Sequence, residues 1–599
     1  MLREERPCPK PALWRWAKGR RTYYDITWAG ASPINHGKTR VLSVKSGKGG
    51  FWNRRVALLG GGAAAAGLAY AAFRPAAEKP ARFLNSDTTT LHRGNGAEPL
   101  SLDPAYVQGE PEENVTGDLN VGLITFDPAG KPIPGIAERW TSSPDGLVWT
   151  FFLREARWSD GVPLTAEDFV FGWRRFLDAK TAAVYAAYLF LVKNAQRVNT
   201  GTLPVEQLGV RAINARTFEI TLEHPAPYLI EMLAHMTCYP HPRHVIQAKG
   251  REWIRPGNHV SSGPFRLVEW TPRERIVLEK NPHFYDAANV ALQRVIFYPT
   301  DDYGAALQRM RSGALDTQTR IPPQQVEWIR ENMPEIYDPV PQLTTEYVCA
   351  NVTRKPFDDP RVRTALGLAL SREAIARRIR RVGDVPAYAL VPPGIANYPA
   401  TPRFRYHNLS QEERVEQGRA LMRQAGFGPD NRVRTSFMLR NTAAGVGRAV
   451  AAAIQQMFSQ VYIDVTIIAN DFATFLSVTS NHDFDLCQAA WSADFNDASN
   501  FLDLFMTDNP NNKGLYSNKA YDALMVQSRR ELDLEKRGQI LARAEQILLD
   551  EHGVIPMWFW VTPDLQRPYV KNWVPNPSNY HRARWVRIDG AEKSRTRVL

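Results

Sequence analysis

Short β-prone runs and longer amphipathic stretches alternate along most of this chain. Residues 148–153 form a compact run of apolar and β-branched residues, and residues 218–222 alternate apolar and polar positions until Pro225 ends the pattern. The segments 265–270 and 275–279 alternate in the same way on either side of Thr271-Pro272. These patterns predict strands, and the last two predict a β-hairpin.

Other stretches repeat their apolar residues at helical spacing. Thr165 stands three residues before Asp168 and opens the stretch to Phe176, which resembles a capping box with Asp in place of Glu or Gln. Residues 361–379 and 410–425 also follow a helical pattern. Strands and helices mixed throughout the chain predict the α/β class.

The N-terminal region has the pattern of an export signal. A basic pair, Arg54-Arg55, precedes an apolar Gly/Ala-rich run that holds Ala69-Tyr70-Ala71, a small-residue cleavage pattern. We therefore expect a signal peptide over residues 54–77 and a periplasmic protein. The pair loosely resembles a twin-arginine signal, and a single membrane anchor is the alternative. Residues 1–53 are interpreted as a basic extension, either disordered or mis-started.

Charge and cysteine content narrow the function. Residues 1–80 hold 15 Lys and Arg but only four acids, so the formal charge of +12 lies almost wholly there and the rest is nearly neutral. A neutral body argues against nucleic-acid binding. None of the four cysteines is spaced as CxxC, and the sequence leaves open one disulfide among Cys238, Cys349 and Cys487.

A series of short motifs carries a resemblance to a known family. They follow one another in a fixed order over residues 95–586: Leu102-Asp103-Pro104, 134–140, 149–154, 158–161, 262–265, 279–282, 356–363 and 490–496. Together they resemble the extracellular solute-binding proteins of family 5, in the oligopeptide-binding branch. The resemblance implies a three-lobed periplasmic binding protein fold of type II (the peptide-binding cluster), with hinge closure over a buried cleft.

The resemblance also implies lobe boundaries. Lobe I is discontinuous, at residues 82–120, 246–345 and 562–590, lobe II covers 121–245, and lobe III covers 346–561. The implied function is the substrate-binding component of an ABC importer. It captures short peptides in extended form, acts as a monomer, and delivers them to membrane permease subunits served by cytoplasmic ATPases. No cofactor, metal or catalysis is expected.

The resemblance assigns ligand-contacting residues. Asp494 matches the acid of a Trp-x-x-Asp motif that holds the ligand ammonium, although from sequence alone it is also a typical cap or turn residue. Strand-like pairing would bind the peptide backbone, which every peptide shares. The other assigned positions, each of which ordinary packing or a surface turn would also explain, are Trp491, Ala490, Ser492, Ala493, Tyr185, Gln108, Gly109, Glu110 and Phe472.

Two positions depart from the family pattern. Some relatives carry a basic residue three positions before the tryptophan, where it helps to hold the ligand carboxylate, and this chain has Gln488 there. Some relatives also carry a disulfide near the cleft, at positions that match Thr344 and Ser492. The aromatic run Trp558-Phe559-Trp560 places both tryptophans on one face of a strand, in cleft or core.

Some residues suggest functions other than peptide binding. His235, Cys238, His241 and His244 recur every three positions and could bind zinc, nickel or copper, but Pro240 and Pro242 forbid the regular helix that would align them. No G-x-S-x-G, HExxH or P-loop pattern supports an enzyme. The main alternative keeps the fold and changes the ligand to a cell-wall peptide, a peptide-like antibiotic, a metal chelate or haem.

Overall fold

The computed structural model describes residues 82–83, 87–107, 109–440 and 446–598. The predicted extension and signal peptide lie outside these residues, as does Gln108. Residues from Pro80 onward form one compact unit. No helix within the described ranges is long and apolar enough to cross a membrane.

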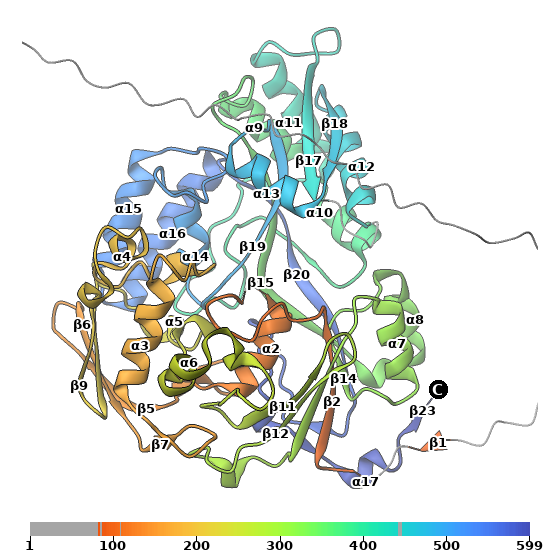
Figure 1. The fold of residues 1–599 in the computed structure, drawn as a ribbon. Coiled ribbons are helices and arrows are strands. Elements are labelled where there is room, and N and C mark those ends of the chain that lie inside the picture. Colours follow the sequence, from red (N-terminus) through yellow and green to blue (C-terminus); the bar gives the residue numbers. More distant parts are fainter. Residues whose placement is uncertain (1–81, 84–86, 108, 441–445, 599) are drawn as a thin grey trace, which may run out of the picture. The chain divides into compact units, whose positions relative to one another are not determined.

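A long mixed sheet runs through this unit. Its strands follow the order β11-β12-β13-β2-β14-β20-β15-β19-β17-β18, and the short strand β16 also pairs with β20. Most neighbours are antiparallel, but β2 is parallel to β13 and β14, and β17 is parallel to β18 and β19. Figure 1 shows β15 and β20 side by side through the middle of the unit. The strands are β2 (Thr90–Gly96), β11 (Phe265–Thr271), β12 (Arg275–Lys280), β13 (Arg294–Pro299), β14 (Thr317–Gln318), β15 (Tyr337–Ala350), β16 (Val385–Pro386), β17 (Val433–Arg440), β18 (Ile463–Asn470), β19 (Leu486–Ser492) and β20 (Ile555–Gln566).

A second, four-stranded antiparallel sheet has the order β5-β6-β10-β9 and packs against α3. Four further strand pairs complete the β-structure. The bounds are β5 (Ala137–Ser142), β6 (Val148–Leu153), β9 (Val210–Asn214) and β10 (Thr217–Thr221) for the sheet; β1 (Arg82–Phe83), β3 (Ile124–Phe126), β4 (Pro132–Pro134), β7 (Ala156–Arg157), β8 (Pro163–Leu164), β21 (Val570–Lys571), β22 (Arg587–Ile588) and β23 (Arg597–Val598) for the pairs.

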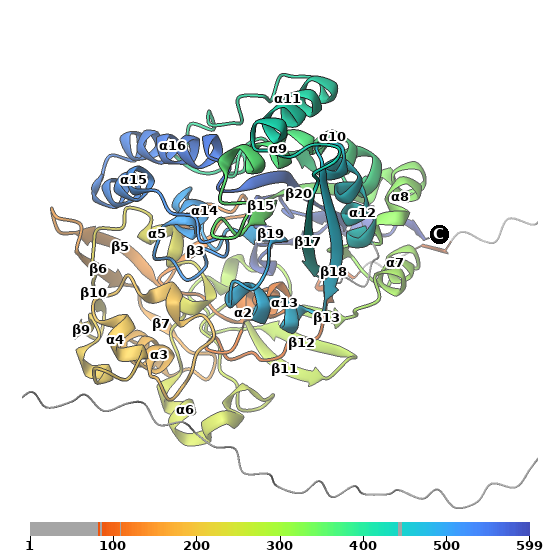
Figure 2. The same ribbon diagram turned by 90° about the horizontal axis from the view of Figure 1, so that it is seen from above.

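Helices cover the sheets, and Figure 2 shows α12 lying against β17 and β18. The α-helices are α2 (Glu110–Leu119), α3 (Ala166–Leu177), α4 (Ala195–Asn199), α5 (Leu229–Met232), α6 (Arg243–Lys249), α7 (Tyr303–Arg311), α8 (Val326–Asn332), α9 (Pro360–Ala369), α10 (Arg372–Ala374), α11 (Gln411–Gln424), α12 (Val446–Ser459), α13 (Phe472–Ser480), α14 (Ser499–Leu502), α15 (Lys519–Arg530), α16 (Leu534–Asp550) and α17 (Gly590–Lys593). Of the short 3-10 and π turns, η1 (Ala186–Leu189) and η8 (Ile375–Arg380) matter below.

Most of the local predictions are confirmed. The run at 148–153 is β6, and the predicted hairpin is the antiparallel pair β11–β12, in which the Glu274 N–H donates to the Thr271 carbonyl at 3.1 Å. The helix predicted after Thr165 is α3, and the Asp168 carboxylate accepts from the Thr165 N–H at 2.8 Å, as a capping box requires.

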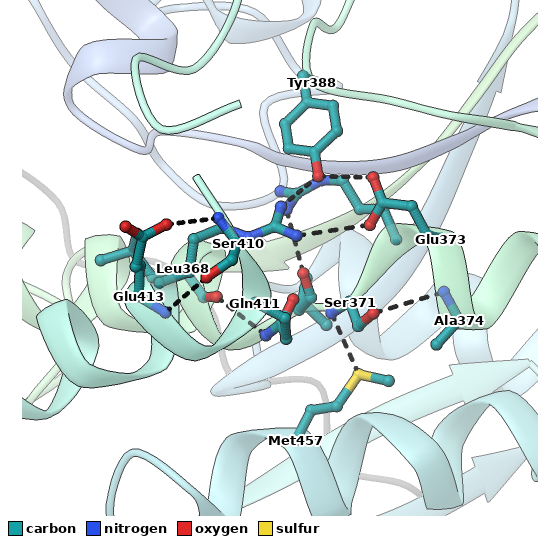
Figure 3. A network of polar contacts seen from close by, with 12 residues as sticks. Leu368, Ser371, Glu373, Ala374, Tyr388, Ser410, Gln411, Glu413 and Met457 are labelled. Carbon is teal, nitrogen blue, oxygen red and sulfur yellow. Dashed lines mark hydrogen bonds and ion pairs between the residues drawn. The ribbon is translucent and has the colours of Figure 1, made fainter. Parts of the chain in front are cut away.

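The helical pattern predicted at 361–379 is confirmed, but the structure breaks it at Leu370 and Ser371. Helix α9 ends at Ala369, Leu370 is extended, and a new helical segment begins after Ser371, whose hydroxyl accepts from the Ala374 N–H. The Ser371 N–H instead contacts the sulfur of Met457 on α12 (Figure 3). The apolar spacing continues through this break, so the pattern alone did not reveal it, but a serine that caps the second segment stops the first. The helical pattern predicted at 410–425 is confirmed as α11, and the structure adds a Ser410–Glu413 capping box at its start.

Buried side chains form several clusters rather than one core. The largest joins the four-stranded sheet and α3 to β11, β12 and β13. Two others lie beneath the strands β15 and β19, one against α16 and one against α9 and α12. A chain of this length is expected to divide its core in this way. The three-lobe boundaries stay a prediction.

Candidate ligand-binding site

The strand β19 has an edge without a strand partner. It pairs with β15 as far as Ser492, whereas its parallel pairing with β17 reaches only Cys487. Within the described part of the chain, the backbone from Gln488 to Ser492 therefore has a neighbouring strand on one side only. An open edge of this kind offers backbone donors and acceptors to an extended ligand.

Small residues line this edge. Ala490 and Ser492 are exposed and Ala493 is half-buried, so another backbone can approach closely. Ser492 lies directly opposite Thr344 on β15, and the Thr344 hydroxyl donates to the Ser492 hydroxyl at 2.8 Å. The two positions matched to a disulfide in some relatives are thus true cross-strand neighbours, joined here by a hydrogen bond.

Asp494 follows this strand and is half-buried. Its backbone N–H donates to Asn500 Oδ1 at 3.3 Å, but its carboxylate has no hydrogen bond or ion pair to any described residue. Burial raises the pKa of this carboxyl to about 7. A carboxylate held in this way is poised to take a cation, because a partly desolvated charge without a partner is costly.

Tyrosines from distant parts of the chain surround Asp494. Burial raises the pKa of Tyr185, Tyr188 and Tyr580, and the negative charge of Asp494 raises it further, so all three hydroxyls stay protonated. Tyr185 stands just before η1, and the ring of Tyr188 stacks on that of His235 at 4.6 Å. The predicted site residue Tyr185 therefore does lie near Asp494.

The residues that follow Asp494 hold its loop in place through two sets of contacts. The Phe495 ring stacks on Tyr228 at 5.2 Å with the ring planes 7° apart. Two residues later, the buried Asp497 carboxylate is held by Arg537 of α16 through two hydrogen bonds of 2.6 and 2.9 Å. The Arg537 guanidinium also lies over the Tyr228 ring at 5.0 Å. Asp494 is therefore presented by a well-anchored loop.

Trp491 is held beside Asp494 by a shared partner. Its indole N–H donates to Asn500 Oδ1 at 2.7 Å, the oxygen that also accepts from the Asp494 backbone. The ring is half-buried and packs against the cluster beneath β15 and β19. Trp491 can thus serve as a wall of the site while its polar atom is satisfied.

The remaining predicted positions belong to other elements. Gly109 is the N-cap residue of α2, and a side chain there would meet the Glu112 carboxylate at 3.2 Å. The Glu110 carboxylate forms an ion pair with Arg320 at 2.7 Å. Gln108 lies outside the described residues, and although Phe472 is the first residue of α13, its side chain is not described.

Gln488, at the position where some relatives carry a basic residue, forms a hydrogen bond within the protein. Its amide donates to Glu346 on β15 at 2.6 Å, and the Trp560 indole donates to the same carboxylate at 2.9 Å. Trp558 is buried, and the Arg380 guanidinium lies over both tryptophan rings, which confirms that they share a face.

The residues considered as metal ligands point to separate partners. Across the described ranges, no group of three or more His, Cys, Asp or Glu side chains is placed to hold a metal ion. Cys238, Cys349 and Cys487 are free and buried. The partners of the four motif residues are Thr237 for His235 (3.1 Å), Met232 for Cys238 (3.6 Å), Arg175 for His241 (3.3 Å) and Asp160 for His244 (2.8 Å).

Several residues near Asp494 were missed by sequence reasoning. Phe495 could have been noticed, since it directly follows the Trp-x-x-Asp motif. Tyr188, Tyr228 and Tyr580 carried no signal, because an isolated tyrosine gives no sign of which distant segment it will contact.

Residues 131–513 match the family of bacterial extracellular solute-binding proteins, family 5. The chain belongs to this family.

Two relatives with known names match most of this chain. The periplasmic oligopeptide-binding protein OppA of Salmonella typhimurium is 36% identical over 500 residues, which cover 83% of this chain and 91% of that protein. The probable deoxycholate-binding periplasmic protein YgiS of Escherichia coli is 35% identical over 510 residues, or 84% and 94% of the two chains.

Solved structures of the same family confirm the predicted fold class. The unliganded open form of the periplasmic murein tripeptide binding protein MppA has a TM-score of 0.74 at 30% identity, over 85% of this chain and 99% of that chain. OppA of Haemophilus influenzae in complex with RPPGFSPFR has a TM-score of 0.72 at 32% identity, over 84% and 99% of the two chains.

Proposed function

We propose that this chain is the substrate-binding component of an ABC importer that captures short peptides in extended form. It would deliver them to membrane permease subunits served by cytoplasmic ATPases, and act in the periplasm as a monomer without catalysis of its own. The relatives named oligopeptide-binding, at 34–36% identity over most of the chain, support this proposal.

The observation that carries the proposal is the unpartnered Asp494 carboxylate beside the open edge of β19. Every free peptide has an α-ammonium at one end of a backbone that can pair with a strand edge. Asp494 supplies the counter-charge, and the edge supplies hydrogen bonds that do not depend on side-chain identity. Related proteins carry names for different ligands, so the site rather than the family decides between them.

The other residues take supporting roles. Ala490, Ser492 and Ala493 would pair with the ligand through their backbone, Trp491 would form a wall, and Tyr185 would close over the ligand. The segment Gln108-Gly109-Glu110 would run beside the peptide, and Phe472 would border a side-chain pocket. Because the contacts of such a site fall mainly on shared peptide groups, wide tolerance of side chains is expected.

The proposal is tested by ligand capture. A chain beginning at Ala77, which contains the whole compact unit, is examined by native mass spectrometry as purified from its host. We expect a heterogeneous mass excess that denaturation releases as short peptides. A clean ligand-free mass, together with no binding of added peptides, would contradict peptide capture.

Calorimetric titration then isolates the role of the ammonium. Ala-Ala-Ala is compared with N-acetyl-Ala-Ala-Ala, which has the same backbone but no positive charge. We expect the acetylated ligand to bind about 100-fold more weakly, because Asp494 is then buried without a partner. Equal affinity for both would refute the role of Asp494, and binding of deoxycholate instead of either peptide would move the assignment to a non-peptide ligand.

A further inference from the structure

Two aspartates face each other where β15 and β20 cross the unit. Asp338 on β15 is the direct antiparallel partner of Asp564 on β20, so both side chains leave the sheet on the same face. Directly opposed residues in antiparallel strands have Cα atoms only about 4.5–5.5 Å apart. Like charges at such a pair repel each other unless a cation lies between them.

Asp564 is the buried member of this pair. Its side chain is 1% exposed, and neither carboxylate oxygen has a hydrogen bond of ordinary geometry to a described residue. Burial, then Glu110 and Asp338, raise its pKa well above the ordinary range, against the charge of Arg93 and a hydrogen bond from the Asn579 side chain. A buried carboxylate normally has good hydrogen bonds to both of its oxygens, so Asp564 is under-satisfied.

Arg93, whose charge acts on Asp564, already serves other acceptors. The Arg93 guanidinium donates to the His581 carbonyl at 2.9 Å and to Asn114 Oδ1 at 2.5 Å, and it lies over the Trp573 ring at 5.0 Å. Arg320 is paired with Glu110 at 2.7 Å. Neither arginine supplies a hydrogen bond to Asp564.

The pair also has an accessible rim. Asp338 and Glu110 are half-buried, so a group from the solvent side can reach them, whereas their neighbour Asp564 is buried. Glu110 begins α2, next to the segment assigned above to the ligand. No described carboxylate group is arranged to hold a metal ion. A single organic cation on a flexible stem, such as an ammonium or a guanidinium, could supply a partner here.

We infer that Asp564, Asp338 and Glu110 form a pocket for one basic side chain, Lys or Arg, of the bound peptide. This inference rests on the proposed function and adds a preference to it. The strand edge and Asp494 bind what all peptides share, and this pocket selects among them. An ammonium or guanidinium there would complete the hydrogen bonds that Asp564 lacks and relieve its repulsion with Asp338.

The test is calorimetric titration of the chain from Ala77 with tripeptides. Lys replaces Ala at each position of Ala-Ala-Ala in turn, and each Lys peptide is paired with a norleucine peptide, which has a similar stem but no charge. We expect Lys to bind at least tenfold tighter than norleucine at one position. Asp564→Asn and Asp338→Asn should each reduce that ratio below threefold and leave the affinity for Ala-Ala-Ala unchanged.

The controls separate this pocket from the proposed function. Asp483→Asn changes the net charge equally at a side chain that is 77% exposed and paired with Arg354, and it should keep the full Lys preference. Thermal unfolding checks that each variant folds, and Asp338→Asn alters only a half-buried residue. Binding of Ala-Ala-Ala without any Lys preference, or a preference that survives both variants, overturns the pocket alone. If no tripeptide binds, the proposed function fails and the pocket falls with it.

Discussion

Glu545 and Asp494 are both carboxyl groups whose pKa is raised to about 7 by burial, but the groups around them differ. Glu545, on α16, accepts hydrogen bonds from the Leu390 and Val391 N–H groups at 2.6 and 2.9 Å and from the Tyr398 hydroxyl. The Asp494 carboxylate accepts none from the described residues. A raised pKa therefore does not single out a ligand site, and the proposal for Asp494 rests instead on the donors that its carboxylate lacks among the described residues.

The largest effect is expected at the satisfied carboxylate. Glu545→Ala removes the acceptor of two buried N–H groups and a tyrosine, so the free energy of unfolding should fall by about 3–5 kcal/mol. Urea denaturation measures this loss. Glu545→Gln keeps one acceptor oxygen and should lose less, and ligand affinity of the folded fraction should be unchanged. A stability loss under 1 kcal/mol for the alanine variant would contradict a structural role for the Glu545 carboxylate.

Asp494→Asn should weaken ligand binding without lowering stability, the reverse of the effect expected for Glu545→Ala. Peptide affinity should fall about 100-fold, equivalent to about 2.7 kcal/mol, because the ligand ammonium loses its charged partner. Stability should not fall. The Asp494 carboxyl is raised to a pKa of about 7 in the folded state, so ionising it costs stability as the pH rises from about 4 to 7, and asparagine removes that cost. Calorimetry and urea denaturation of the same sample check both halves.

Ligand affinity should depend on pH through Asp494. Below its pKa of about 7, binding of an ammonium requires the carboxyl to lose a proton, so affinity should fall about tenfold per pH unit with release of a proton. Above about pH 8 the α-amino group of the peptide loses its own charge, and affinity should fall again. Titrations from pH 5 to 9 measure this profile. Asp494→Asn should lack the acid limb, and a flat profile in the wild type would count against the assignment.

The smallest effect concerns how Asp494 is positioned. Asn500→Ala removes the oxygen that holds both the Trp491 indole and the Asp494 backbone, so the affinity for Ala-Ala-Ala should fall about fivefold. Asn500→Asp restores an acceptor but adds a charge near Asp494, and should raise the pH of half-maximal binding. If Asn500→Ala binds like the wild type, the loop needs no such support.

The sequence predicted the secondary structure well where it depends on residues close together in the chain. The capping box at Thr165 and the hairpin around Thr271 each depend on residues a few positions apart, and both are confirmed. The break in the helical stretch at Ser371 was not predicted, because it depends on contacts that periodicity does not show.

The site was predictable only in part. Asp494 and Trp491 were identified through a motif, and the structure adds that the Asp494 carboxylate has no partner among the described residues. The tyrosines around it come from segments 86 to 309 residues away in sequence, so only the fold brings them together. The opposed pair Asp338 and Asp564 was likewise invisible, since strand register between distant segments is set by the whole sheet.

The stacking of Phe495 on Tyr228 has a consequence for the lifetime of the complex. Asp494 and Phe495 are adjacent, and Arg537 contacts both Asp497 and Tyr228, so the carboxylate cannot swing away without disturbing these contacts. Release of a ligand held by Asp494 is thereby tied to separation of two aromatic rings. We therefore expect residence time, more than the rate of capture, to respond when Tyr228 or Phe495 is changed.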